Sequence, residues 1–153
     1  MNRRPARVLA LQMLYAWTLR ADESVDAVLS AISANFLNHG VEDSDEAVEA
    51  KDPSAERTEL ARYGRFIAGT VIEKVEEIDK LISDHTPNWN IERIAIVDKN
   101  LLRIAIAELM YSKEIAYRIV IDEAIQIAKE YGSNESGRFV NGVIDSIYRT
   151  LSK

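Results

Sequence analysis

The first residues that could carry chemistry are three arginines at the N-terminus, Arg3, Arg4 and Arg7, with no acidic residue before Asp22. On a helix Arg7 lies about one turn from both Arg3 and Arg4, so it can share a face with either. A helix N-terminus already favours anions through its free N–H groups and its dipole, so cations there point to an anion bound beside them. The cluster predicts a polyanion site. The alternative is a flexible basic tail that aids solubility.

A second group lies near the C-terminus, in the segment GRFVNG of residues 137–142. Phe139 falls one residue off the apolar stripe of its helix, so we expect it to be partly exposed. An exposed aromatic ring beside an arginine, here Arg138, can stack a base of single-stranded RNA. The alternative is that Phe139 is a core residue and that Asn141 and Gly142 allow tight helix packing.

Signals for an enzyme are weak. His39 and His85 are 46 positions apart and are expected at helix ends, without the spacing of metal ligands. The acidic pairs Asp122–Glu123 and Glu76–Glu77 are typical of solvated helix faces. The sequence has no nucleophile elbow, phosphate-binding loop or dinucleotide-binding glycine motif, and no cysteine. We therefore expect no catalytic residue, no metal site and no cofactor.

The charges are unevenly distributed along the chain. Its formal net charge is −6, which alone argues against a nucleic-acid binder. Residues 1–20 nevertheless carry +4, residues 21–60 carry −9 and residues 61–153 carry −1. A basic head on an acidic chain is compatible with a local site for a polyanion.

The length and composition indicate one globular domain. The chain has 153 residues, of which 47% are hydrophobic and 29% charged. No apolar run approaches the ~18 residues of a membrane span, so no membrane contact is expected. The arginines and apolar residues at the N-terminus superficially resemble a signal peptide, but Gln12 interrupts the apolar run and no cleavage site follows. The sequence predicts a cytoplasmic protein.

The elements that must position these residues are helices, because apolar residues recur at steps of three and four along most of the chain. In the first helix this stripe includes Tyr15 and Leu19. The first predicted helix begins near Pro5, and the second follows the capping residue Ser24. Four more are predicted at about 54–83, 91–96, 98–111 and 118–131. The last helix begins after a capping residue within 133–136.

Glycines and an acidic segment mark the features between and within these helices. Gly64 and Gly69 lie inside the third helix, where close approach of another helix backbone would explain them and a hinge is the alternative. Gly132 suits the position after the sixth helix. Residues 40–56 contain seven acids and few large apolar residues, which predicts an exposed linker.

The fold expected is an all-α bundle of about seven helices with a break near residues 83–90, which suggests two sub-bundles in one domain. The N-terminal sub-bundle would cover about 3–84 and the C-terminal one about 88–152.

Several motifs, taken in order, resemble the NusB family of bacterial transcription antitermination factors. They are RRPAR (3–7) with ALQMLYAW (10–17), LRIA (102–105) with EL (108–109), DEAI (122–125) with AK (128–129), and RFVNGVID (138–145). The resemblance covers nearly the whole chain apart from residues 40–56, and the combined motifs are highly specific.

The resemblance implies an all-α, NusB-like fold of two packed three-helix sub-bundles and a non-enzymatic activity. Family members bind single-stranded boxA RNA with the ribosomal protein NusE, act on RNA polymerase with NusA and NusG, and support ribosomal RNA synthesis. The RNA-binding positions that match are Arg3, Arg4, Arg7, Tyr15, Glu135, Arg138 and Phe139. Asp98 and Arg103 match the helix presented to NusE. Some members form homodimers that cover the RNA site, and for this chain that question is open.

Two departures from the family pattern stand out. Pro5 replaces a third arginine that some members have, which weakens the basic patch by one charge. The acidic segment 40–56 has no obvious counterpart, and it could screen RNA or alter self-association. Two other functions remain as alternatives: the RNA-binding domain of a ribosomal RNA methyltransferase, for which we see no methyl-donor domain after the last helix, and a protein adaptor that has lost RNA contact.

Overall fold

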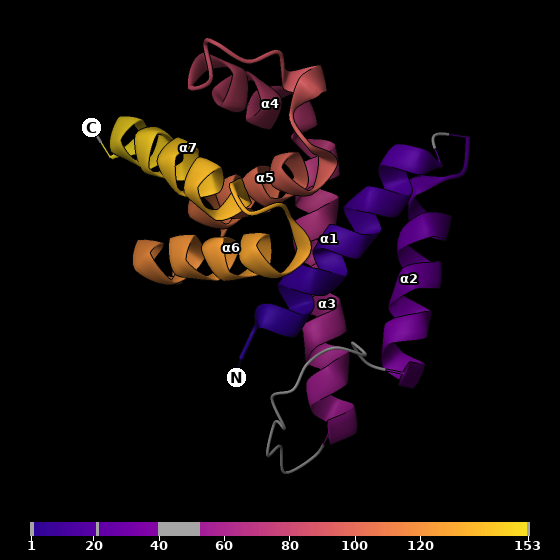
Figure 1. Ribbon diagram of the computed structural model, residues 1–153. Helices are drawn as coiled ribbons and strands as arrows, with labels where there is room; N and C mark the ends of the chain where they lie inside the picture. Colours follow the sequence, from indigo (N-terminus) through magenta and orange to yellow (C-terminus); the bar gives the residue numbers. More distant parts are fainter. Residues whose placement is uncertain (1, 21, 40–52, 153) are drawn as a thin grey trace. The chain divides into compact units, whose positions relative to one another are not determined.

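The computed structural model describes residues 2–20, 22–39 and 53–152, and these residues are all-helical (Figure 1). Over these residues it has seven α-helices, one short 3₁₀ helix and no strand, which confirms the predicted fold class. The elements are α1 (Arg4–Leu19), α2 (Val25–His39), α3 (Pro53–Glu73), α4 (Val75–Asp84), η1 (Ile91–Arg93), α5 (Ile96–Tyr111), α6 (Tyr117–Tyr131) and α7 (Ser136–Leu151). Most of the acidic segment, residues 40–52, lies outside the described residues.

The chain divides into two compact units, Met1–Gly69 and Thr70–Lys153. The boundary lies inside α3, earlier in the chain than the sequence suggested. The punctuation at Thr86–Pro87 marks the end of α4, but α4 contacts η1, α5 and α7, all of the second unit. The turn near residue 87 is therefore a turn within the second unit.

In the first unit, α1 packs against α2 through a row of buried apolar side chains. Leu9, Met13 and Leu14 are fully buried. The predicted cap of α2 is confirmed, because the Ser24 hydroxyl accepts a hydrogen bond from the Ala27 N–H at 3.1 Å. Tyr15 is 47% exposed and Leu19 is 63% exposed, so their places in the predicted apolar stripe of α1 were wrong.

Gly64 is where α3 lies against the first turns of α1. A Cβ built at Gly64 would come 2.8 Å from the backbone oxygen of Ala6 and 3.1 Å from the Leu9 side chain. This confirms the predicted close approach at Gly64. The same explanation is wrong for Gly69, where a Cβ would meet nothing within 4 Å.

The predicted third helix is two helices in the structure. The α-helix breaks at Lys74, whose backbone angles are φ −107° and ψ 20°. β-Branched residues cluster around this break at Thr70, Val71, Ile72 and Val75, and such residues lower helix propensity. After the break, Ile78 and Ile82 of α4 are fully buried, which compensates for the interruption.

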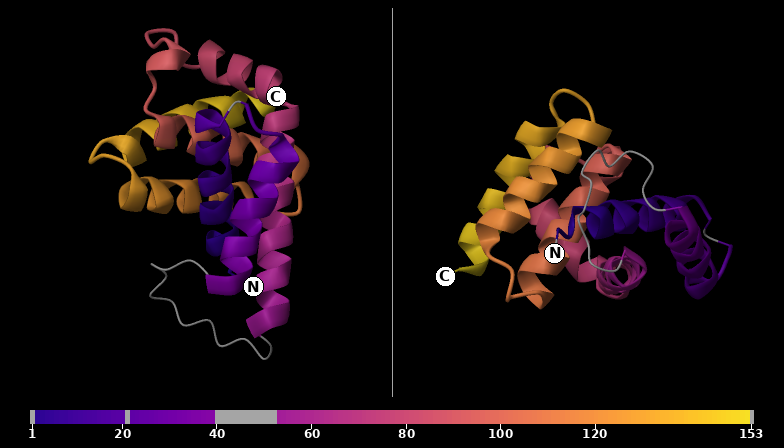
Figure 2. Two further views of the ribbon diagram at one scale, coloured as in Figure 1. Left: turned by 90° about the vertical axis from the view of Figure 1, so that its right-hand side faces the viewer. Right: turned by 90° about the horizontal axis from the view of Figure 1, so that it is seen from below.

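In the second unit, α5 is buried along most of its length and contacts α4, α6 and α7. Helices α6 and α7 lie side by side in both figures (Figure 2). The predicted helix at 91–96 is only the 3₁₀ helix η1, and α5 begins at Ile96, slightly earlier than expected. The core of this unit includes Leu101, Leu102, Ile106, Ile127, Ile144 and Ile147.

The turn between α6 and α7 depends on Gly132, but not through a left-handed backbone. Gly132 directly follows α6, as predicted, and its φ of −100° lies outside the left-handed region. A Cβ there would instead come 2.4 Å from the Ser136 Oγ and 2.7 Å from the Ala128 oxygen. The Ser136 hydroxyl accepts a hydrogen bond from the Ser133 N–H at 2.9 Å, while no side chain caps α7.

Candidate nucleic-acid interface

The first turn of α1 carries positive charge and no acidic residue. The Asn2 side chain holds this turn in place, because its Oδ1 accepts a hydrogen bond from the Arg4 N–H at 2.9 Å. Pro5 occupies one of the first helical positions, where its missing N–H costs nothing. The helix dipole and the arginines therefore add at this end, and an anion there would be stabilised by both.

The Arg3 side chain is positioned by an aromatic ring from α3. Its guanidinium lies 4.5 Å from the centre of the Tyr63 ring, the geometry of a cation–π contact. Tyr63 in turn lies 6.2 Å, centre to centre, from the Phe66 ring. Nothing in the sequence indicated that Tyr63 lies beside Arg3, so this contact was missed.

The three N-terminal arginines differ in exposure. Arg3 and Arg4 are half-buried, whereas Arg7 is only 4% exposed. Arg7 therefore presents much less charge to a ligand than the other two. Tyr15, further along α1, is 47% exposed and can offer its ring to a base.

In the second unit, Phe139 of α7 is half-buried, which confirms the predicted partial exposure. The Trp89 ring packs against it at 5.6 Å between centres and 60° between planes, an edge-to-face contact. Arg138 and Glu135, on the first turn of α7 and just before it, are both exposed. The second predicted group thus combines an aromatic ring with two exposed charges.

A shallow groove of about 300 Å³ lies beside this aromatic pair. It is lined by residues 85–89, which follow α4, and by Arg138, Phe139, Gly142 and Val143 of α7. Trp89 was missed in the sequence. The signal that could have found it is its place in a connecting segment, directly after Thr86-Pro87-Asn88. Binding residues occur disproportionately often in such loops.

The comparisons with known proteins agree with the resemblance. Residues 4–149 match the sequence profile of the NusB family. The transcription antitermination protein NusB of Thermodesulfovibrio yellowstonii is 35% identical over 96% of this chain and 91% of its own length. The chain belongs to the NusB family.

Two further NusB-family matches add detail. The NusB protein of Chloroherpeton thalassium is 39% identical over 98% of this chain, which spans only 63% of that relative's length. A crystal structure of the antitermination factors NusB and NusE in complex with dsRNA is similar with a TM-score of 0.75 and 26% identity. It covers 97% of this chain and 96% of the matched chain.

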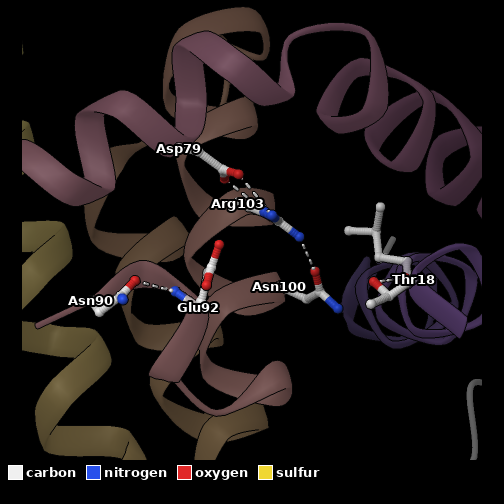
Figure 3. Close-up of polar contacts among 7 residues, drawn as sticks. Thr18, Asp79, Asn90, Glu92, Asn100 and Arg103 are labelled. Atoms are coloured by element: carbon white, nitrogen blue, oxygen red, sulfur yellow. Dashed lines mark hydrogen bonds and ion pairs between the residues drawn. The ribbon is translucent and has the colours of Figure 1, made fainter.

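Asp98 and Arg103, the two positions that the resemblance matched to a partner-binding helix, are both buried. Figure 3 shows the polar contacts of Arg103. The Arg103 Nε and Nη2 donate to the two Asp79 carboxylate oxygens at 2.8 Å each, and Nη1 donates to the Asn100 Oδ1 at 3.0 Å. Arg103 therefore joins α5 to α4. Asp98 is 8% exposed, and its Oδ1 has no hydrogen-bond donor among the described residues.

The two histidines of this family member lie at the ends of different helices. His39 ends α2 and His85 follows α4, which confirms both predicted positions at helix ends. Across residues 2–20, 22–39 and 53–152, no three acidic or histidine side chains come together as metal ligands. None of the described helices is both long and apolar enough to span a bilayer.

Proposed function

We propose that this chain is a non-enzymatic transcription antitermination factor that binds boxA-type single-stranded RNA together with a NusE-type ribosomal protein and supports ribosomal RNA transcription in the cytoplasm. The observation that carries the proposal is the first turn of α1, where cations gather without an acid on a chain of net charge −6. Membership of the NusB family supports it.

In the first unit, Arg3 and Arg4 contact RNA phosphates, and Tyr15 offers its ring to a base. The cation–π contact with Tyr63 restricts Arg3 before the RNA arrives, which lowers the entropy lost on binding. Arg7 contributes mainly by supporting the turn, because its side chain is buried.

In the second unit, Phe139 stacks a base and Arg138 contacts a phosphate. The Glu135 carboxylate can accept a hydrogen bond from an amino group of a base, a contact that carries sequence information. Stacking on Phe139 and the Glu135 carboxylate make binding depend on the RNA sequence, whereas the arginines raise the affinity for any RNA.

The NusE-type partner binds at α5. The similarity to a NusB chain crystallised with NusE supports a partner of this type. Because Arg103 is engaged with Asp79, it acts by positioning the helix, and Asp98 contacts the partner through the small part of the residue that is exposed. The assembled RNA, NusE, NusA and NusG then act on RNA polymerase. Joint binding raises affinity above that of either contact alone.

The proposal is tested by fluorescence anisotropy with a labelled boxA RNA and a scrambled RNA of equal length as control. Three phosphate contacts give a slope of log affinity against log salt of roughly −2 for a single strand. The variant with Arg3→Ala, Arg4→Ala and Arg7→Ala is expected to bind weakly and with a shallower slope. Unchanged binding would refute the assignment of the arginines.

The partner is tested by light scattering of the protein alone, with NusE, and with NusE and RNA. The proposal expects one copy of each in the complex. Asp98→Asn, which keeps the side-chain size, is expected to change affinity for NusE while thermal stability stays the same. A homodimer that persists in the presence of both partners would contradict the proposed assembly.

A further inference from the structure

The groove beside Trp89 has the size and lining of a small-ligand site. Its volume of about 300 Å³ is at the low end of ligand pockets, which suits one nucleotide. The described residues that line it include aromatic rings, a histidine, an asparagine and an arginine, and no acid. The chain has a net charge of −6, yet this groove is lined by a cation and, among the described residues, no acid. The groove therefore favours an anionic ligand over a neutral one.

Trp89 is held in place although it is 57% exposed. The Trp89 backbone N–H donates to the Thr86 backbone oxygen at 3.0 Å, and the buried Thr86 hydroxyl donates to the Ile82 backbone oxygen at 2.7 Å. One edge contact with Phe139 fixes the ring from the other side. An indole that is both ordered and exposed is a prepared surface for stacking, since little entropy remains to be lost when a base covers it.

Gly142 keeps the groove open. It lies in the middle of α7, where glycine costs ~0.5–1 kcal/mol relative to alanine. A Cβ built at Gly142 would meet nothing within 4 Å, so the tight packing suggested for this glycine was wrong. Helix packing therefore does not require glycine here, and the open space beside Gly142 is part of the groove.

His85 adds a fixed polar edge to the same groove. Its Nδ1 hydrogen-bonds the Ser146 hydroxyl at 2.8 Å, which orients the ring and leaves Nε2 as the nitrogen for a ligand. Arg138 is exposed at the groove and can pair with a phosphate. The stacking surface matches the face of a nucleotide's base, the polar histidine matches the edge of that base, and the cation matches the phosphate.

We propose that this groove binds a single nucleotide of the RNA, with its base stacked on Trp89, its base edge toward His85 and its phosphate on Arg138. The inference rests on the proposed RNA binding and adds Trp89, His85 and Gly142 to the residues that carry it. Binding in the groove would then depend on the base of the nucleotide as well as on its charge.

The first test uses tryptophan fluorescence. The chain has two tryptophans, so the Trp17→Phe variant leaves Trp89 as the only indole. Titration with boxA RNA is expected to quench its emission, because a stacked base quenches an indole. The same RNA with an abasic site at the stacked position is expected to bind more weakly and to leave the emission nearly unchanged. Binding seen by anisotropy without quenching by any RNA would overturn the inference while leaving the proposed function intact.

The second test separates stacking from charge. Trp89→Ala is expected to weaken RNA binding about tenfold or more and to leave the salt slope unchanged, since no charge is removed. Arg138→Ala is expected to make the slope shallower by about 0.7. Ile119→Ala removes an apolar side chain that is 52% exposed on α6 and is the matched control, with no expected effect on RNA.

The third test fills the groove without removing a contact. Gly142→Leu is expected to weaken RNA binding about as much as Trp89→Ala, whereas Gly142→Ala is expected to raise thermal stability. If Trp89→Ala and Gly142→Leu change only NusE binding, the occupant is a protein and the inference is wrong. If the unaltered protein binds no RNA, both the proposed function and this inference fall.

Discussion

Arginine serves two different purposes in the two units. In the first turn of α1, Arg3 and Arg4 are half-buried at the positive end of a helix that has no acid in that turn. In α5, Arg103 is buried, and its guanidinium meets both carboxylate oxygens of Asp79. The first arrangement gathers positive charge at a helix end, where an anionic ligand is favoured. The second is already neutralised within its own unit.

The difference shows that a family position alone does not tell a binding arginine from a structural one. Burial separates the two cases, because a buried guanidinium without compensation would be very costly. Arg7 illustrates the intermediate case: it belongs to the basic motif but is 4% exposed. Substitutions that separate stability from RNA binding can therefore test each assignment.

The largest effect is expected for Arg103→Ala, which leaves Asp79 partly buried without its partner. Loss of one member of such a pair costs about 3 kcal/mol or more of the free energy of unfolding. Urea denaturation measures it. Lys80→Ala is the control, because the Lys80–Asp84 pair at 3.0 Å is exposed and contributes only about 0.5 kcal/mol or less. Equal losses of unfolding free energy for both variants would contradict the structural role assigned to Arg103.

A smaller loss is expected when α3 is pushed away from the arginine-bearing end of α1. Gly64→Ala places a Cβ near the Ala6 oxygen and should cost about 1–3 kcal/mol. Gly69→Ala, in the same helix but in open space, should stabilise the protein by up to ~1 kcal/mol. Thermal unfolding of the two variants compares them directly, and two shifts in the same direction would contradict the described packing.

Removing the two half-buried cations of the first turn is expected to change RNA binding but hardly the stability of the protein. In Arg3→Ala/Arg4→Ala, loss of the contact with Tyr63 opposes the relief of charge repulsion at the helix end, and each term is ~0.5–1 kcal/mol. The salt slope for RNA should become shallower by about 1.4. If the unfolding temperature fell strongly while the salt dependence of RNA binding stayed the same, Arg3 and Arg4 would be structural residues like Arg103.

The smallest effect concerns Tyr117 in the second unit, where burial and then the hydrogen bond to Asp145 raise the pKa of the phenol above its usual value of 10.0. Because the folded state holds this proton more tightly, the stabilisation is complete below the unfolded pKa of about 10 and is lost as pH rises through the folded pKa. Ultraviolet difference titration of the unaltered protein against Tyr117→Phe measures it. Asp145→Asn is expected to move the pKa back toward its usual value.

Much of the fold follows from the sequence because helix signals are local. Ser24 caps α2 as expected, and the apolar periodicity gives α1, α5, α6 and α7 to within a few residues. The break at Lys74 was missed because the apolar spacing continues through it. The boundary between the units depends on which helices α4 contacts, and those contacts are long-range.

The candidate site was less predictable. The sequence indicated the arginines and a partly exposed Phe139, both from local patterns. It could not indicate that Tyr63 lies under Arg3 or that Trp89 lies against Phe139, because each pair is separated by about fifty residues or more and meets only in the folded unit. Nor could it separate buried Arg7 from Arg3 and Arg4.

The division at Gly69 places one indole in each unit, Trp17 in the first and Trp89 in the second. The protein thus contains its own pair of optical reporters. Emission from Trp17→Phe and Trp89→Phe variants, followed through a denaturant gradient, would show whether the two halves lose their structure together or one after the other.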